Sequence, residues 1–519
     1  MLGNAPDMLV TYRLLTPFFG LPCSHRSGRV WPSSPMNGNL ISFSNLDFTS
    51  DHPTLNRAFR IAIGDLFSNI LPHQSGLLDA PRPMIMAGLD YETPWTRDAA
   101  INCWNGGSLL VPDAARNTLL GVLENTEGQA LIGGEYWDKI IWVTGAWHHY
   151  LVTGDRVFLA SALQTATATL EFMEQTEFDP AHNLFRGGAC FQDGVAAYPD
   201  RYALTNGSSG IIDWISANPQ ERAPAGMGLP MMACSTNCLY YSAYLRIAEM
   251  LRELGLSGAE AHETKASRLR EAILTHFWDN TTGSLAYLLD EQGLCRHQEG
   301  LGAAFALLFG VLDPSQAKHL FTTQHITPHG IPCVWPTFAR YLGKNGKDLG
   351  RHSGTIWPQV NAFWAEAASR HNRTDLLVEE LLSLASKADR DVQFTELYHS
   401  ATGEIYGGLQ EGLTDSSIGL WKSCRRQTWS ATGFLRMILH GLLGLRFEKD
   451  GLRFQPQTVA PVTSFRLRGL TYRKTLFSLE VTGTGHQIAS VHINGAPRSE
   501  ALIAAEATGE QQIVIHLTN

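Results

Sequence analysis

The stretch Tyr91–Ala100, YETPWTRDAA, gathers side chains that can hold a polar molecule with flat faces. Arg97 keeps its proton near neutral pH and presents N–H donors in a fixed fork, while Asp98 accepts hydrogen bonds. Together they can grip vicinal hydroxyl groups, with Tyr91 and Trp95 as ring surfaces. In the structural alternative, Asp98 caps the following helix and forms a buried ion pair with Arg97. The pattern favours a binding wall.

A second cluster, GGEYWDKIIW, also precedes an apolar helix. Glu135 and Asp138 flank Tyr136 and Trp137, again joining carboxylates to aromatic rings. Asp138 could serve only as a helix cap. We expect one of the two carboxylates to bind ligand beside Trp137.

A third cluster, GGACFQDGVAAYPDRY, places Asp193 among apolar residues of a long connection. An apolar setting raises the pKa of a carboxyl group by desolvation, which suits a general acid near neutral pH. Asp193 therefore becomes the candidate acid, unless Asp-Gly only forms a turn here. Asp200 competes for the role, although its place between Pro199 and Arg201 suggests an ion pair in a turn.

The fourth cluster, QFTELYHSATGEIYGG, offers Glu396 and Glu404 as bases that could activate water. Upstream, Trp335, His352 and Trp357 lie in and after another long connection and are candidate ligand contacts. Two carboxylates from separate loops, surrounded by Trp and Arg, form the arrangement that cleaves glycosidic bonds.

Other chemistries find no support in the sequence. It contains no G-x-S-x-G elbow, no P-loop and no G-x-G-x-x-G after a strand. Of the eight Cys, only Cys234 and Cys238 lie close together, without a His at metal-ligand spacing. We expect buried reduced thiols, no metal and no cofactor.

The overall composition restricts the partners. The net charge of −9, with only 17% charged residues, argues against nucleic acid or an anionic membrane surface. Thirteen Trp and 48 Gly fit a large enzyme with structured loops. The chain shows neither a membrane-spanning run nor a good signal peptide, so we expect a cytoplasmic protein that acts on an oligosaccharide or small glycoside. The oligomeric state is left open.

Helical periodicity dominates the chain from about residue 55 to residue 445. Apolar stripes predict ten to twelve helices, separated by long connections at 176–230, 322–353 and 389–428. After residue 445, alternating apolar residues and strand formers predict β structure. We therefore predict an N-terminal extension (1–50), a mainly α domain (51–445) and a small C-terminal β domain (446–519).

Five motifs in order resemble the six-hairpin glycosidases: PWTRDAA, YWDKIIWVTGAWHHYLVTGD, HSGTIWPQVNAFWAEAA, ELYHSATGE and TWSATGFLRMILHGLLGLRF. Roughly residues 50–519 take part, and the closest likeness is to glycoside hydrolase family 63 and debranching-enzyme glucosidase-like proteins. The resemblance implies an (α/α)6 barrel with a C-terminal β domain. It also implies cleavage of a terminal α-linked sugar, expected to be an α-glucoside, with inversion.

In that family an Asp acid lies between the fifth and sixth barrel helices, and a Glu base between the eleventh and twelfth. The resemblance thus assigns these roles to Asp193 and Glu396, although FQDG departs from the usual acid motif. Glu135 or Asp200 are the alternative acids and Glu404 is the alternative base. The Arg-Asp of TRDAA resembles the pair that holds the terminal sugar.

Three rival functions stay open. An α-L-rhamnosidase of the family 78 type would share the barrel and change only the sugar. A polysaccharide lyase on an (α/α) toroid would use Tyr or His as base, for which Tyr398 and His399 are available. The third rival is a sugar-binding barrel without catalysis.

Overall fold

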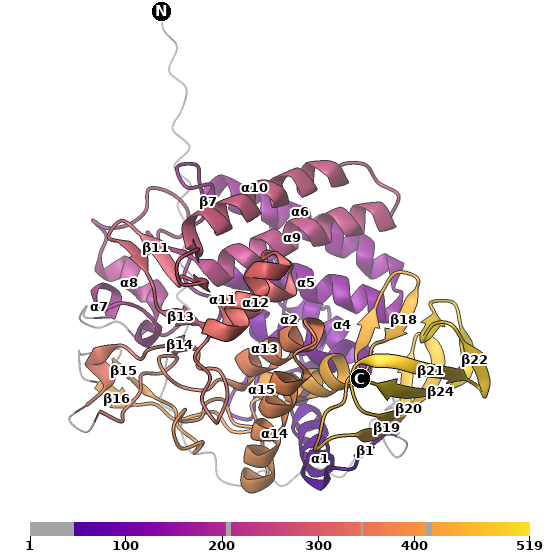
Figure 1. Cartoon of the computed structure of the whole chain (residues 1–519). Helices are drawn as coiled ribbons and strands as arrows, with labels where there is room; N and C mark the ends of the chain where they lie inside the picture. Colours follow the sequence, from indigo (N-terminus) through magenta and orange to yellow (C-terminus); the bar gives the residue numbers. More distant parts are fainter. Residues whose placement is uncertain (1–45, 204–208, 344–345, 412–417) are drawn as a thin grey trace, which may run out of the picture. The chain divides into compact units, whose positions relative to one another are not determined.

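The computed structural model describes residues 46–203, 209–343, 346–411 and 418–519. Within this part of the chain, six inner helices contact one another in a closed ring, in which the last packs against the first (Figure 1). They are α2 (Thr96–Asn102), α5 (Tyr136–Thr153), α9 (Cys234–Glu253), α11 (Gly300–Leu308), α13 (Pro358–Arg370) and α15 (Thr428–Arg436).

Six outer helices alternate with the inner ones along the chain. They are α1 (Pro53–Ser68), α4 (Pro112–Gly121), α6 (Arg156–Thr176), α10 (Ala259–Phe277), α12 (Pro314–Thr323) and α14 (Thr374–Asp391). This closed set of α-hairpins confirms the predicted (α/α)6 barrel.

Burial explains which helix takes which layer. Nearly every residue of α5 is buried, as expected of a helix that is apolar on all sides. The outer helix α6 buries one stripe, including Phe158, Ala162 and Leu170, and exposes the opposite face. Pro residues begin α1, α4, α12 and α13, where a missing N–H costs nothing. Gly154, with φ 74°, ends α5 in the left-handed conformation that glycine adopts readily.

One barrel helix escaped the sequence prediction. The outer helix α12 (Pro314–Thr323) lies between two predicted segments, and only Ala317, Leu320 and Phe321 of it are buried. Three buried positions in ten residues make too short a stripe for periodicity to distinguish from a loop.

The C-terminal region is β structure, as predicted. A six-stranded sheet has the order β1 (Asp47–Ser50), β19 (Ser464–Tyr472), β20 (Lys474–Gly483), β24 (Thr508–Thr518), β21 (Gln487–Ile493) and β22 (Ala496–Arg498). The pair β20 and β24 is parallel and the other pairs are antiparallel. A second sheet holds β17 (Leu445–Phe447), β18 (Gly451–Phe454) and β23 (Leu502–Ala504).

Strand β1 comes from the segment that the sequence assigned to the N-terminal extension. It pairs with β19, so that Asp47 lies opposite Arg468. Residues 1–45 of that extension lie outside the described residues.

The long connections all lead from an outer helix to the next inner helix. Because the helices of each hairpin run antiparallel, the six inner helices begin at the same end of the barrel. The connections are 69–95, 122–135, 177–233, 278–299, 324–357 and 392–427. Five of them, together with the first turns of α2 and α5, carry all the candidate site residues. The fold thus brings residues that are hundreds of positions apart to one end.

Several of these connections contain small hairpins. They are β2 (Ile70–His73) with β3 (Arg82–Ile85), β4 (Leu123–Thr126) with β5 (Gln129–Ile132), β6 (Phe178–Asp179) with β7 (Leu184–Phe185), β9 (Trp278–Asp279) with β10 (Ser284–Leu285), and β15 (Leu409–Glu411) with β16 (Ile418–Leu420).

Seven of the eight Cys lie in the described residues, and all seven are free thiols. Six are buried and Cys295 is half-buried. Among the same residues, no group of His, Cys, Asp and Glu could hold a metal ion. No helix in the described ranges is both long and apolar enough to span a membrane.

Candidate active site

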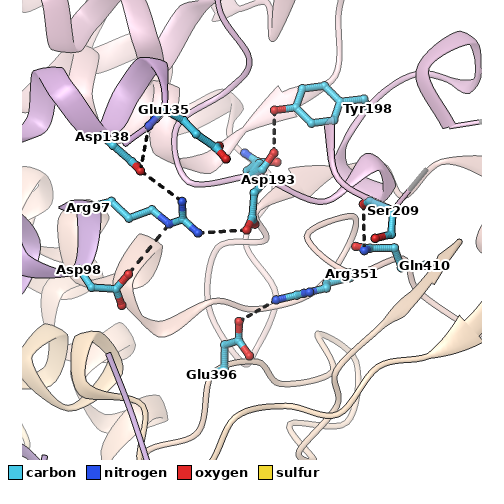
Figure 2. A network of polar contacts seen from close by, with 11 residues as sticks. Arg97, Asp98, Glu135, Asp138, Asp193, Tyr198, Ser209, Arg351, Glu396 and Gln410 are labelled. Carbon is cyan, nitrogen blue, oxygen red and sulfur yellow. Dashed lines mark hydrogen bonds and ion pairs between the residues drawn. The ribbon is translucent and has the colours of Figure 1, made fainter. Parts of the chain in front are cut away.

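Arg97, in the first turn of α2, lies at the centre of a group of carboxylates (Figure 2). Its Nη2 donates to Asp193 Oδ2 at 3.0 Å, its Nη1 to Asp138 Oδ2 at 3.5 Å, and its Nε lies 4.0 Å from Asp98 Oδ2. We call Asp98, Glu135, Asp138 and Asp193 the acidic cluster. Three separate stretches of chain therefore meet at a single guanidinium.

The acidic cluster keeps acceptor atoms free. Oδ1 of Asp98, Oδ1 of Asp138 and Oε2 of Glu135 are buried without a hydrogen-bond partner. Buried polar atoms are nearly always paired, so unpaired ones mark a place where a polar ligand can bind. Hydroxyl groups of a sugar would supply the missing donors.

Helix capping accounts for only part of these carboxylates. Trp95 and not Asp98 is the N-cap of α2, so the capping part of the structural alternative is wrong, whereas its buried ion pair with Arg97 is present at 4.0 Å. Asp138 does support its helix, because its Oδ2 accepts from the backbone N–H of Glu135 at 3.3 Å. The same oxygen accepts from Arg97, and the other one is free.

Asp193 lies in a connection that is folded tightly around it. Its carbonyl oxygen accepts from Ile211 N–H at 2.7 Å. The hydroxyl of Tyr198 donates to Gln192 O at 2.7 Å and accepts from Ala189 N–H at 3.0 Å. Protein atoms enclose the Asp193 carboxyl group, and 27% of the side chain is still accessible to water. A carboxyl group that is surrounded by protein atoms but still accessible to water can contact a bound substrate.

The prediction that the pKa of Asp193 is raised is wrong in direction. Burial favours its neutral form, but the positive charges of Arg97 and then Arg351 outweigh burial and hold the pKa below its ordinary value. The raised values belong to its neighbours. Burial, with Asp138 adding to it, raises the pKa of Glu135 to about 8, and burial raises the pKa of Asp98 well above its ordinary value.

Glu396 is held at both carboxylate oxygens. Arg351 Nη2 donates to its Oε1 at 3.1 Å, and Cys424 N–H donates to its Oε2 at 3.1 Å. Its own N–H donates to Cys424 O at 2.9 Å, and only 4% of the side chain is exposed. A cation and a backbone donor thus fix the orientation of both oxygens, as a general base that must meet a water molecule requires.

Arg351 binds Glu396, and its charge also acts on Asp193. Its guanidinium lies between Asp193 and Glu396 in Figure 2. Although burial acts in the opposite direction, the charges of Glu396 and Asp193 raise the pKa of Arg351. The two carboxylates therefore face the same guanidinium from different connections. The ring of Trp421 lies under that guanidinium, 4.8 Å from its carbon.

The predicted aromatic contacts divide into two groups. Tyr91 and Trp95 are half-buried, and Arg97 lies 5.7 Å from the Trp95 ring centroid. Burial, followed by the negative charge of Glu396, raises the pKa of Tyr91 well above its ordinary value. Both residues thus border the site.

The other predicted contact residues are buried more deeply or lie apart from the acidic cluster, and their contact with a ligand stays a prediction. Trp137, His352 and Trp357 are almost completely buried, and His352 stacks on Trp357 at 4.3 Å. They support the walls from behind because the connections fold over them. Trp335 is half-buried and stacks on His325 at 4.1 Å instead of joining the acidic cluster.

The two alternatives outside the cluster lie on the surface. Asp200 is 61% exposed, and its partner is Arg340 at 2.7 Å instead of the neighbouring Arg201. Glu404 is 69% exposed and pairs with Arg390 at 3.2 Å. Neither contacts the acidic cluster or Glu396 in the described part of the chain, whereas Glu135 is a member of the cluster.

The sequence reasoning missed Arg351 and Trp421. Arg351 directly precedes the predicted His352, so its neighbour was selected and Arg351 was overlooked. An Arg directly beside a predicted contact residue, in a long outer-to-inner connection, was the signal that could have found it.

Comparisons with known proteins agree with this arrangement. Residues 140–430 match the sequence model of the mannosylglycerate hydrolase MGH1-like glycoside hydrolase domain. No curated protein matches the chain.

Similar solved structures show the same fold. A structure titled "Sialidase" shares 13% identity at a TM-score of 0.66, over 89% of this chain and 42% of its own. A family 78 rhamnosidase of a Bacillus species shares 14% identity at a TM-score of 0.52, and the match covers 91% of this chain and 44% of that structure. The family 63 mannosylglycerate hydrolase of Thermus thermophilus, in complex with glucose, shares 15% identity at a TM-score of 0.53. This match covers 73% of this chain and 100% of that structure.

The chain thus spans less than half the length of the first two structures. The family match covers more than half of this chain and includes both α9 and α13 of the inner ring, as well as Asp193 and Glu396. The chain belongs to the MGH1-like family of glycoside hydrolases.

Proposed function

We propose that the protein hydrolyses a terminal α-linked sugar, an α-glucoside by preference, with inversion at the anomeric carbon. The observation that carries this proposal is that Arg351 donates to Glu396 at 3.1 Å while its guanidinium lies between Glu396 and Asp193, which come from the connections that precede α15 and α9. An acid and a base on separate loops are the two groups that inversion needs.

In the proposed reaction, Asp193 gives its proton to the glycosidic oxygen as the bond from that oxygen to the anomeric carbon breaks. A water molecule attacks the anomeric carbon from the opposite face, and Glu396 takes a proton from that water. The products are an alcohol and a sugar of inverted anomeric configuration. Inverting enzymes keep the two carboxyls about 6.5–9.5 Å apart, which leaves room for the water.

Asp193 must first gain a proton, although Arg97 favours its ionised form in the free protein. A bound sugar would displace water from the 27% of this side chain that is accessible, and its hydroxyls would share the donors of Arg97. Both changes raise the pKa of a carboxyl group. We propose that substrate binding thereby raises the pKa of Asp193 until it can hold the proton that it later donates.

The charge of the site favours a neutral sugar. Five carboxyls (Asp98, Glu135, Asp138, Asp193 and Glu396) surround two guanidinium groups, those of Arg97 and Arg351. Both guanidinium groups are already paired with carboxylates. Because both guanidinium groups are already paired, neither is free to neutralise a uronate, so a polysaccharide lyase is disfavoured.

The two residues that could act as the base of a lyase, Tyr398 and His399, make contacts outside the acidic cluster. Tyr398 is fully buried and accepts from Thr395 N–H at 3.4 Å, while His399 Nε2 lies 3.0 Å from Lys347 O. An α-L-rhamnosidase would use the same barrel, so only a substrate test separates it from an α-glucosidase.

The test is a panel of aryl α-D-glucoside, α-D-mannoside and α-L-rhamnoside, with glucosylglycerate and mannosylglycerate, followed by proton NMR from the first minutes. We expect turnover of an α-D-glucoside and early accumulation of the β-anomer. An α-anomer formed first would refute inversion, and release from a polyuronate of an unsaturated product absorbing in the ultraviolet would indicate a lyase. Sugar binding in calorimetry without any turnover would indicate a non-catalytic barrel. Glu396→Gln is the inactive control.

A further inference from the structure

Arg340 occupies a buried position between two loops of the site. It lies in the short helical turn Ala339–Tyr341, within the connection that leads to α13, and 7% of its side chain is exposed. Its guanidinium carbon lies 4.8 Å from the Phe338 ring centroid and 4.4 Å from that of Tyr341. Two aromatic faces thus restrict the plane of the guanidinium.

One side of this guanidinium binds the loop of Asp193. Nη2 donates to Tyr198 O at 2.6 Å and to Val195 O at 3.2 Å, and Nη1 donates to Asp200 Oδ1 at 2.7 Å. Val195 N–H in turn donates to Ser209 O at 3.0 Å. The turn that directly follows Asp193 is therefore fixed by side-chain donors.

The other side approaches the loop that begins at Glu396. Nε lies 3.5 Å from Glu411 Oε1, and the Tyr341 hydroxyl donates to Glu411 Oε2 at 2.6 Å. Glu411 ends β15, whose Leu409 O accepts from Arg351 N–H at 2.8 Å. Arg351 is the residue that holds Glu396.

We propose that Arg340 is a positioning residue that sets the place of Asp193 relative to Glu396, and this inference rests on the proposed function. It contacts neither carboxyl. It joins the loop of Asp193 directly to the loop of Glu396, through contacts of its own and of Tyr341. Lysine has no planar fork, so it could not satisfy two carbonyls and two carboxylates in the same geometry.

The test uses the dependence of the rate on the leaving group, because an acid helps a poor leaving group more than a good one. Wild type, Arg340→Gln and Arg340→Lys are compared on the dinitrophenyl and the methyl glycoside of the sugar that wild type cleaves. Misplacement of a catalytic group by about 1 Å can cost ~10²-fold. We expect Arg340→Gln to lose roughly 10²-fold in kcat/KM on the methyl glycoside and less than about tenfold on the dinitrophenyl glycoside.

Arg340→Lys keeps the charge and should show the same dependence with a smaller loss, which also covers the case that Arg340→Gln does not fold. Arg390→Gln is the matched control, because Arg390 pairs with Glu404 and Asp391 on the surface of the protein. It should equal wild type on both substrates. Equal losses on the two glycosides, or no loss, would overturn the proposal for Arg340. A wild-type protein that cleaves no glycoside would instead refute the proposed function.

Discussion

Removal of the Arg97 guanidinium should make the stability of the protein depend strongly on pH. Arg97 contacts Asp193 at 3.0 Å, Asp138 at 3.5 Å and Asp98 at 4.0 Å, and its side chain is only 10% exposed. The variant Arg97→Ala leaves the acidic cluster buried without its cation. Removing one partner of a buried ion pair costs about 3–5 kcal/mol of unfolding free energy.

The sign of the pH effect follows from the pKa values. In wild type, the lowered pKa of Asp193 contributes stability above its unfolded value, and this contribution is lost as pH falls through the folded pKa. Without Arg97, burial is opposed mainly by the more weakly acting charge of Arg351, so we expect the pKa of Asp193 in the folded protein to rise above its unfolded value. The folded variant then binds more protons than its unfolded chain, and its stability falls as pH increases above about 4.

The assay is thermal unfolding of wild type and Arg97→Ala from pH 4.5 to pH 8. An unfolding entropy of about 2 cal/mol/K per residue, over the unit Ser42–Asn519, makes 1 kcal/mol equal to about 1 °C. We expect Tm to fall by about 3–5 °C at pH 8 and by roughly half of that or less at pH 4.5. Binding and turnover should also weaken for every substrate with the same terminal sugar.

Arg57→Ala is the matched control for this experiment. Arg57 makes two hydrogen bonds to Asp389, at 2.7 Å and 2.6 Å, but the pair lies on the surface. Its loss should change Tm little and equally at both pH values. If Arg97→Ala loses the same Tm at pH 4.5 and pH 8, or no more than Arg57→Ala, the reasoning about the cluster is refuted. A large fall in Tm with unchanged activity per folded molecule would assign Arg97 a structural role alone.

Three further predictions concern single carboxyls. Glu396→Gln should lose ~10²–10⁴-fold in kcat with binding retained, whereas the exposed Glu404→Gln should keep wild-type kinetics, and the opposite pattern would exchange their roles. Burial raises the pKa of Glu135 to about 8, so activity should fall as Glu135 ionises beside Asp193. Glu135→Gln should then move the alkaline limb of kcat upward by about one pH unit, and an unmoved limb would exclude Glu135. Burial raises the pKa of Asp65 to about 6, so the folded state binds a proton that the unfolded chain has lost. The free energy of unfolding should therefore fall by up to about 3 kcal/mol as pH rises from about 4 to 6. Unfolding titrations of Asp65→Asn should lack this fall, and an unchanged pH dependence would contradict the prediction.

Local sequence was sufficient for the elements and for the order of the chemistry along the chain. The periodicity that predicted α6 is a property of neighbouring residues, because burial of one face depends on a 3.6-residue repeat. Glycine, aromatic and carboxylate clusters likewise marked the connections that carry Glu135, Asp193 and Glu396, since a long loop in a compact domain is usually functional. The barrel and the β region followed from these elements and from the order of the motifs.

Only the tertiary structure decided the electrostatics of the site. Asp193 sits among apolar residues in sequence, which predicted a raised pKa, but Arg97 lies 3.0 Å away in space although 96 positions separate them. Arg351 meets Glu396 across 45 positions. Coulomb energy depends on distance through space and on local burial, and neither can be obtained from the spacing of residues along the chain. The burial of Trp137 is likewise a tertiary property. Its place in the sequence identified it as part of the site, but its complete burial depends on the connections that fold over it.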